Sequence, residues 1–261
     1  MLSILRLFLC WSFCVWSVTA ANKKHSAKPV DHDEDEAPSS AATTSVAPKP
    51  PTPDSKDDHD HSPKPASVAT LSEDEIKDFA QYSPALQDLI RKSLELTRKN
   101  LTYQFGSADP SCGGMDCSGS IYYVLNEMGL KDVPRQSDLM CRWVMRHAVL
   151  YRTENVAQFS DQPFSAIQPG DLVFWTGTYA SPTPHSLFIT HVMVYLGKRK
   201  KDDKPLLFGS SEGRSFDGER RNGVSVFDFK IPPAGRTKGA LFGYGRIPGL
   251  KVEEVRKAEL P

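Results

Sequence analysis

The chain carries no net charge, because 32 lysines and arginines balance 32 aspartates and glutamates over 261 residues. A neutral balance gives no electrostatic reason to bind nucleic acid or an anionic surface, so we expect no nucleic-acid partner. The apolar run at residues 7–18 has about a dozen residues, against the roughly 20 that a membrane-spanning helix needs. Once this segment is removed, we expect no stable membrane span.

The first twenty residues are typical of a secretory signal peptide. Arg6 supplies a positive charge before the apolar run, and small residues end it at Ala20, after which we expect cleavage. A retained membrane anchor is the alternative. A lipid anchor is not favoured, because no small-residue lipobox precedes Cys10 or Cys14 in the run. We therefore expect export to the periplasm, the extracellular space or the cell wall.

Residues 21–70 contain eight prolines and no aromatic residue. Such a composition cannot bury enough apolar surface to offset the entropy of ordering, so we predict a disordered linker over 21–70. Four of the seven histidines lie here, and three of them alternate with aspartate at 31–33 and 58–61. Tracts of this kind can bind metal, but a solvated acidic linker is the interpretation we favour.

Three cysteines follow the expected signal peptide, namely Cys112, Cys117 and Cys141. An odd number of cysteines in an exported protein indicates at least one free thiol. A disulfide between Cys112 and Cys141 would leave Cys117 free, but the sequence does not show whether the geometry permits it.

Hydrophobic periodicity predicts an α+β domain over residues 71–250 and a flexible tail over 251–261. Residues 84–99 have helical spacing behind a Ser-Pro cap, and a second helix is expected after Asp116 and before Gly129. Short apolar strands are expected at 172–175, 191–196, 206–208, 224–229 and 241–244. Helices followed by strands favour an antiparallel sheet with helices packed on it.

Cys117 is the candidate nucleophile. Asp116 is a good N-cap and would place Cys117 in the first turn of a helix. The unpaired backbone N–H groups and the helix dipole there favour the reactive thiolate, and the same N–H groups could hold an oxyanion. A buried, inert cysteine is the alternative. The Asp, Ser and Gly neighbours favour a functional cysteine instead.

His191 is the candidate base, because a thiolate nucleophile works best with a group that also protonates the leaving amine. Outside the predicted linker the histidines are His147, His185 and His191. His191 begins an apolar strand, where alternation places it on one face with Met193 and Tyr195. A structural core histidine is the alternative, but an activated cysteine that needs a partner favours the base.

Five blocks of the sequence resemble, in order, motifs of the NlpC/P60 peptidases. They are residues 103–106, 116–119, 134–137, 169–175 and 191–197. The resemblance implies a papain-like core in which the helix of Cys117 packs against the sheet that carries His191. It also implies hydrolysis of peptide bonds in peptidoglycan stem peptides, often between D-glutamate and a diamino acid. Stem peptides are therefore the expected partner of a monomer, and thiol chemistry needs no metal or organic cofactor.

The resemblance also implies roles for residues around the Cys–His pair. Tyr103 would lie beside the oxyanion region. Asp116 and Ser118 would line the substrate pocket, where some family members hold the free amine of a stem peptide. Core packing is the alternative role of Tyr103, and Asp116 can cap the helix and contact substrate together.

One departure from the family concerns the third polar residue, commonly a histidine on the strand after the catalytic histidine. Phe208 occupies that place here. Strand alternation puts Ser210 on the same face as Phe208, so we predict Ser210 as the third residue. Glu212 or a backbone carbonyl is the alternative. Because such a group mainly sets the tautomer and orientation of the base, its loss affects rate more than reaction type.

Three functions fit the sequence. The first is an exported cysteine endopeptidase that forms an acyl-enzyme on Cys117, and the five blocks with the signal peptide favour it. The second is an N-acetylmuramoyl-L-alanine amidase, or an acyltransferase, on the same scaffold. The third is a cell-wall binding module with a decayed site, which the missing third histidine would explain.

Overall fold

The computed structural model describes residues 64–153, 156–179, 189–233, 235–236 and 238–250. The expected signal peptide, most of the expected linker, the tail over 251–261 and His185 lie outside the described residues, so those assignments stay predictions. Within the described part of the chain, no helix is both long and apolar enough to cross a membrane.

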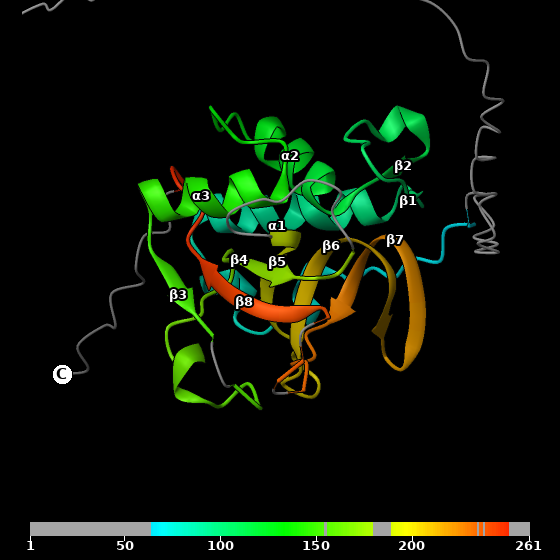
Figure 1. Cartoon of the computed structure of the whole chain (residues 1–261). Coiled ribbons are helices and arrows are strands. Elements are labelled where there is room, and N and C mark those ends of the chain that lie inside the picture. Colours follow the sequence, from blue (N-terminus) through cyan, green and yellow to red (C-terminus); the bar gives the residue numbers. More distant parts are fainter. Residues whose placement is uncertain (1–63, 154–155, 180–188, 234, 237, 251–261) are drawn as a thin grey trace, which may run out of the picture. The chain divides into compact units, whose positions relative to one another are not determined.

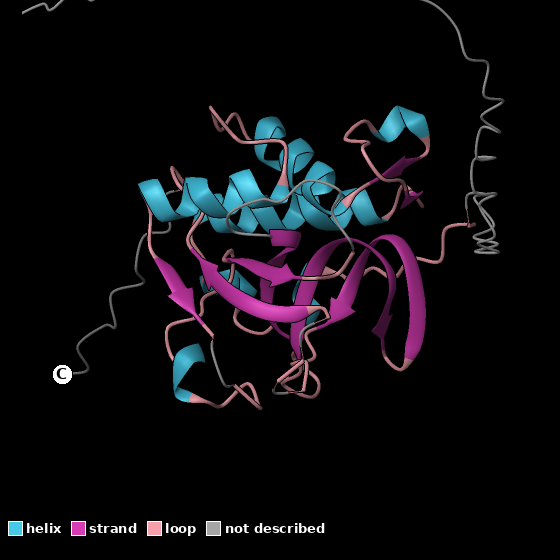
Figure 2. Ribbon diagram, viewed as in Figure 1, coloured by secondary structure: helices cyan, strands magenta, loops and turns pink. Residues whose placement is uncertain are grey.

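Helices cover one side of a sheet (Figures 1 and 2). The helices are η1 (Glu73–Glu75), η2 (Phe79–Gln81), α1 (Pro84–Thr97), η3 (Pro110–Cys112), α2 (Cys117–Glu127), α3 (Ser137–His147) and η4 (Gln162–Phe164). The strands are β1 (Thr102–Tyr103), β2 (Gly114–Met115), β3 (Leu150–Arg152), β4 (Leu172–Thr176), β5 (Ile189–Lys198), β6 (Pro205–Phe216), β7 (Glu219–Asp228) and β8 (Ala240–Gly245).

The main sheet has six strands in the order β3-β8-β4-β5-β6-β7, and its neighbouring strands are antiparallel. β1 and β2 form a separate parallel pair. Helices α1 and α2 precede the sheet in the chain; α1 packs on β6 and the edge strand β7, and α2 packs on β5 and β6. The predicted α+β domain with an antiparallel sheet is therefore confirmed.

Helix α1 forms where its cap and its apolar spacing predict it. The Ser83 hydroxyl accepts from the backbone N–H of Leu86, and Pro84 occupies the first turn, where its missing N–H costs nothing. Leu89 and Leu94 lie on the buried face of the helix with Leu86. Burying a leucine side chain contributes roughly 1.5–3 kcal/mol, so this face fixes the helix on the sheet.

Helix α2 begins at Cys117, as predicted. The Asp116 carboxylate caps it by accepting from the backbone N–H of Gly119 at 2.6 Å. Gly119 has no room for a side chain, because an added Cβ would lie 2.1 Å from the carbonyl oxygen of Ser107. The helix ends at Glu127, and the nearby Gly129 has φ of +78°, a conformation that glycine adopts readily. The loop before Cys117 is thus held close to the first turn.

Helix α3 was not predicted from the sequence. Its buried side chains include Met140, Cys141 and Val144, which have the spacing of one helical face. The charged and aromatic residues between them obscure this signal. His147 is the last residue of the helix.

The two faces of β5 belong to different cores. Val192 and Val194 pack into the core beneath the helices. Met193 and Tyr195 pack into a second core on the opposite face of the sheet, which also contains Trp175. The predicted alternation is confirmed, and it places His191 on the Trp175 side of the sheet.

Residues 64–70, the end of the predicted linker, are described and run beside β7, which is the last strand of the main sheet. Ser67 and Asn222 exchange two backbone hydrogen bonds of 2.9 Å. The carbonyl of Ala69 accepts from the N–H of Val226 at 2.9 Å. These bonds satisfy backbone groups at a sheet edge that would otherwise be open.

Candidate active site

The Cys117 sulfur lies where helix α2 meets strand β5. The backbone N–H groups of Val192 and Ser118 lie close enough to it to lower the pKa of the thiol. Val192 directly follows His191, so the nucleophile candidate contacts the main chain beside the base candidate. Cys117 is 6% exposed, so the thiol is almost completely buried.

The pairing of β5 with β6 explains how the N-terminus of α2 comes close to Val192 of β5. The paired positions of the two strands begin at Val194 with Phe208 and continue to Lys198 with Pro205. Val192 lies beyond the first of these pairs, so its N–H is available to the Cys117 sulfur rather than to β6. The sheet thus opens at the N-terminal end of β5 and admits the first turn of α2.

His191 is held against an aromatic wall. It pairs with Trp175 of β4 across the ladder, and the two ring centroids are 5.6 Å apart. His191 is 6% exposed, and its Nε2 atom has no hydrogen-bond partner among the described residues. The Nε1 atom of Trp175 also has none within the described part of the chain.

Arg214 is a neighbour of both candidate catalytic residues. Its guanidinium lies 4.2 Å from the centroid of the Trp175 ring, a cation–π contact. The arginine charge lowers the pKa of His191, and the Cys117 thiolate would raise the pKa of Arg214. Both effects require proximity, so Arg214 lies near Cys117 and near His191.

The surroundings favour the neutral forms of the candidate pair. Burial raises the pKa of Cys117 to about 11, and the charge of Asp116 adds to the effect. Burial also lowers the pKa of His191 well below its usual value, and Arg214 lowers it further. The net shift of the Cys117 pKa is therefore opposite to the one expected from the helix terminus alone. The N–H contacts are present and lower the pKa of Cys117, but desolvation outweighs them.

The Asp116 carboxylate is already occupied by groups of the protein itself. Beyond capping α2, it accepts from the N–H of Gly106 at 2.9 Å and from both terminal nitrogens of Arg135 at 3.0 and 2.8 Å. Arg135 also donates to the Ser118 hydroxyl at 3.0 Å. The capping role of Asp116 is confirmed. A contact of Asp116 or Ser118 with a substrate amine stays a prediction, and Arg135 would compete with that amine.

Tyr103 lies close to the thiol, as the resemblance implied. Burial raises the pKa of the Tyr103 phenol, and the negative charges of Cys117 and Asp116 raise it further. Burial and the negative charge of Cys117 also raise the pKa of Tyr179. Its ring packs edge-on against Phe105, with ring centroids 5.8 Å apart. Tyr103 and Tyr179 are therefore both near the Cys117 sulfur, and no sequence motif indicates Tyr179.

The structure does not bring the predicted third residue to the base. The Ser210 hydroxyl donates to the carbonyl of Met115 at 2.6 Å, on the helix side of β6. Alternation places Ser211 on the other side, where it lines a cavity together with His191 and Glu212. Neither Ser210 nor Glu212 hydrogen-bonds the Nε2 atom of His191. The prediction followed Phe208, which faces the helices, whereas His191 faces away from them.

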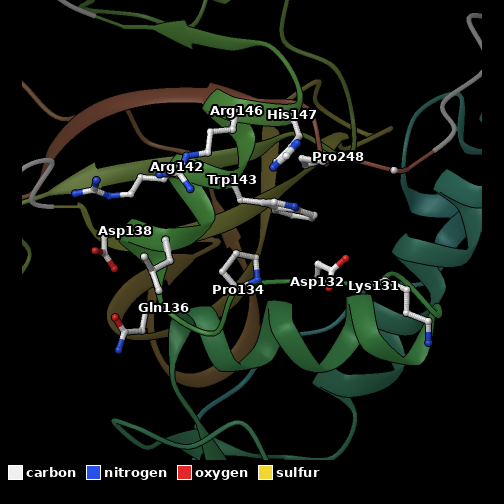
Figure 3. Close-up of a pocket in the computed structure, with 12 residues that line it drawn as sticks. Lys131, Asp132, Pro134, Gln136, Asp138, Arg142, Trp143, Arg146, His147 and Pro248 are labelled. Carbon is white, nitrogen blue, oxygen red and sulfur yellow. The ribbon is translucent and has the colours of Figure 1, made fainter. Parts of the chain in front are cut away.

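Two cavities lie near these elements. One, of about 580 Å³, is lined by His191, Trp175 and Arg214. The other, of about 840 Å³, lies beside α3 and is lined by Trp143, His147 and several charged residues (Figure 3). His147 therefore belongs to a different cavity from His191.

The cysteines of the described part of the chain carry no cross-link. Cys112 is exposed and Cys141 is buried, and both are free, as is Cys117. Among the described residues, no three His, Cys, Asp or Glu side chains lie close enough together to hold a metal ion.

No curated protein matches the sequence. A solved structure from Staphylococcus aureus subsp. aureus Mu50, described as similar to a lipoprotein of the NLP/P60 family, is 19% identical with a TM-score of 0.40. That match covers 70% of this chain and 44% of the other, so the chain spans less than half of that protein. The model of the NlpC/P60 family matches residues 100–217, which include both candidate catalytic residues. This match places residues 100–217 in the NlpC/P60 family.

Proposed function

We propose that the protein is an exported cysteine endopeptidase that hydrolyses peptide bonds in peptidoglycan stem peptides, between D-glutamate and a diamino acid. Membership of the NlpC/P60 family supports a cell-wall peptidase-like function in general. The observation that carries the finer proposal is the position of the Cys117 sulfur. It lies at the N-terminus of α2, close enough to the backbone N–H of Val192, the neighbour of His191, for that group to lower its pKa.

In the proposed reaction the Cys117 sulfur attacks the carbonyl carbon of the scissile bond. Its proton passes to His191, which then donates it to the leaving amine. The product is a thioester on Cys117, and water activated by His191 hydrolyses it. The backbone N–H groups at the start of α2 would face the oxyanion, with Tyr103 beside it.

Proton transfer from thiol to imidazole must follow substrate binding in this proposal. The site without substrate favours a neutral Cys117 and a neutral His191. Substrate has to supply interactions that stabilise the charged pair, which is differential binding in favour of the reacting state.

Products of peptidoglycan digestion test the proposal. We would incubate purified peptidoglycan with the wild-type protein and with Cys117→Ala, and identify the released fragments by mass spectrometry. The proposal expects stem fragments cut after D-glutamate from the wild type only. Release of whole stem peptides would identify an amidase instead, and transfer of an acyl group would identify an acyltransferase. Identical products from both proteins would exclude catalysis by Cys117.

A non-catalytic cell-wall binding module is the second candidate. The absence of any partner for the Nε2 atom of His191 among the described residues favours it, because peptidases of this kind usually orient the base. Sedimentation with insoluble peptidoglycan separates the two candidates. A binding module would co-sediment equally well as wild type and as Cys117→Ala while releasing no soluble fragments.

A further inference from the structure

The cavity of about 580 Å³ beside His191 is strongly basic. Arg214, Lys230, Arg236 and Lys238 line it, against one acidic residue, Glu212. Glu212 is itself ion-paired with a lysine outside the lining. The cavity therefore presents an excess of positive charge to whatever enters it, which favours an anionic ligand.

Arg214 stands out among these cations. Within the described part of the chain it forms no ion pair, and its contact is with the face of Trp175 at 4.2 Å. Lys230, by comparison, donates to the hydroxyl of Ser215 at 2.6 Å and lies 3.9 Å from Asp228. A guanidinium carries five donors in a planar fork that matches a carboxylate. Arg214 is thus available to an incoming anion.

Two buried polar atoms on residues that line the same cavity also have no partner among the described residues. They are the Nε1 atom of Trp175 and the Nε2 atom of His191, on side chains that are 0% and 6% exposed. A buried polar group without a hydrogen bond is costly and rare in folded proteins. Trp175 can only donate, and His191 donates when its proton is on Nε2. A hydrogen-bond acceptor could therefore bind Trp175 Nε1 and, in that tautomer, His191 Nε2.

We propose that this cavity binds a carboxylate group of the substrate, which accepts hydrogen bonds from Arg214, Trp175 and His191. The proposal rests on the proposed function and specifies its substrate as a peptide with a free carboxylate near the scissile bond. A carboxylate offers about four acceptor positions, enough for all three donors. Arg214 now covers the Trp175 ring, so it has to turn toward the anion as the ligand enters.

The bound carboxylate would replace the missing third residue by setting the tautomer and orientation of His191. Accepting from Nε2–H fixes the tautomer of His191 and leaves Nδ1 unprotonated, ready to take the proton of Cys117. The negative charge also stabilises the imidazolium that this transfer creates. A peptide that brings its own carboxylate thereby converts the neutral resting pair into the reactive one, and a peptide without it does not.

Matched peptides test the proposal without requiring turnover. The ligand is the tripeptide L-Ala-γ-D-Glu-diamino acid, prepared with both carboxylates free and with each one replaced in turn by a carboxamide. Binding is measured by calorimetry on the full-length Cys117→Ala protein and on the same protein carrying Arg214→Gln. Because hydrogen bonds to charged groups are the strong ones, we expect one of the two amidations to weaken binding by about 10- to 100-fold. Arg214→Gln should remove that difference.

The matched control is Arg146→Gln, the same substitution at an exposed arginine of α3 that lines the other cavity. It should leave the carboxylate preference intact. Equal binding of all three peptides, no binding of any, or a preference that survives Arg214→Gln would each overturn the proposal. Competition by inorganic phosphate at equal concentration would also overturn it, by showing a general anion site.

The nitrogen NMR resonances of His191 distinguish carboxylate binding from a purely structural role of Arg214, which would not change them. The free-carboxylate peptide should shift the Nε2 resonance toward its protonated form, and the inactive amide should not. With Cys117 intact, carboxylate binding without hydrolysis would refute the proposed function alone. Equal hydrolysis rates for all three peptides would refute this inference alone.

Discussion

Without substrate, Cys117 should react slowly with thiol reagents near neutral pH. Burial raises its pKa to about 11, so at pH 7 about one molecule in 10⁴ carries the thiolate. A thiol with the ordinary pKa of about 8.5 has about 3% thiolate at that pH. Since the thiolate is the reactive form, alkylation of Cys117 should be about 300-fold slower than that of an ordinary thiol.

Iodoacetamide labelling followed by peptide mapping measures this directly. Cys112 is exposed and provides an internal reference for the reagent in the same sample. The rate at Cys117 should rise about tenfold with each pH unit from 7 to 10, as expected for a single group titrating near 11. A rate that is already constant between pH 5 and 8 would show a preformed thiolate–imidazolium pair and refute this reasoning.

Three substitutions test the packing that positions the site, each by urea unfolding. Gly119→Ala should lower the free energy of unfolding by about 1–3 kcal/mol, because its Cβ would meet the Ser107 carbonyl at 2.1 Å; an unchanged midpoint would contradict that close approach. Asp116→Asn keeps a helix cap but removes the charge that pairs with Arg135. Because this ion pair is partly exposed, the substitution should lower the free energy of unfolding by about 1–2 kcal/mol. An increase in stability would show that the pair does not offset its desolvation. Leu89→Ala, at a fully buried position of α1, should cost about 2–5 kcal/mol, and a cost below 1 kcal/mol would place it outside the core.

Local signals predicted the elements that position the nucleophile and the base. The N-cap residue Asp116 fixed the start of α2 one residue before Cys117, and its cap is confirmed at 2.6 Å. The apolar alternation from His191 onward predicted the strand β5 and its two faces. Capping and alternation depend on neighbours along the chain, so a sequence is enough to find them.

Residues that act across strands could not be predicted in the same way. To choose between Ser210 and Ser211, one must know the register of β6 against β5. That register is set by pairing between residues that are distant in the sequence. The irregular register of β6 between Glu212 and Ser215 carries Arg214 to Trp175, and no local pattern indicates it.

The net pKa shift of Cys117 could not be predicted from the sequence for a related reason. The helix terminus is a local feature, and its N–H contact is present. Desolvation depends on how completely the rest of the fold covers the sulfur, which the sequence around Cys117 does not show. At 6% exposure the burial dominates.

A covalent intermediate on Cys117 tests the central claim most directly. A stem peptide is mixed with the wild-type protein, quenched in acid during turnover, and the intact protein mass is measured, followed by peptide mapping. The account predicts a mass increase equal to the N-terminal part of the peptide, located on Cys117 and absent from Cys117→Ala. Cleavage products that accumulate at the same rate with Cys117→Ala, with no adduct on the wild type, would contradict it.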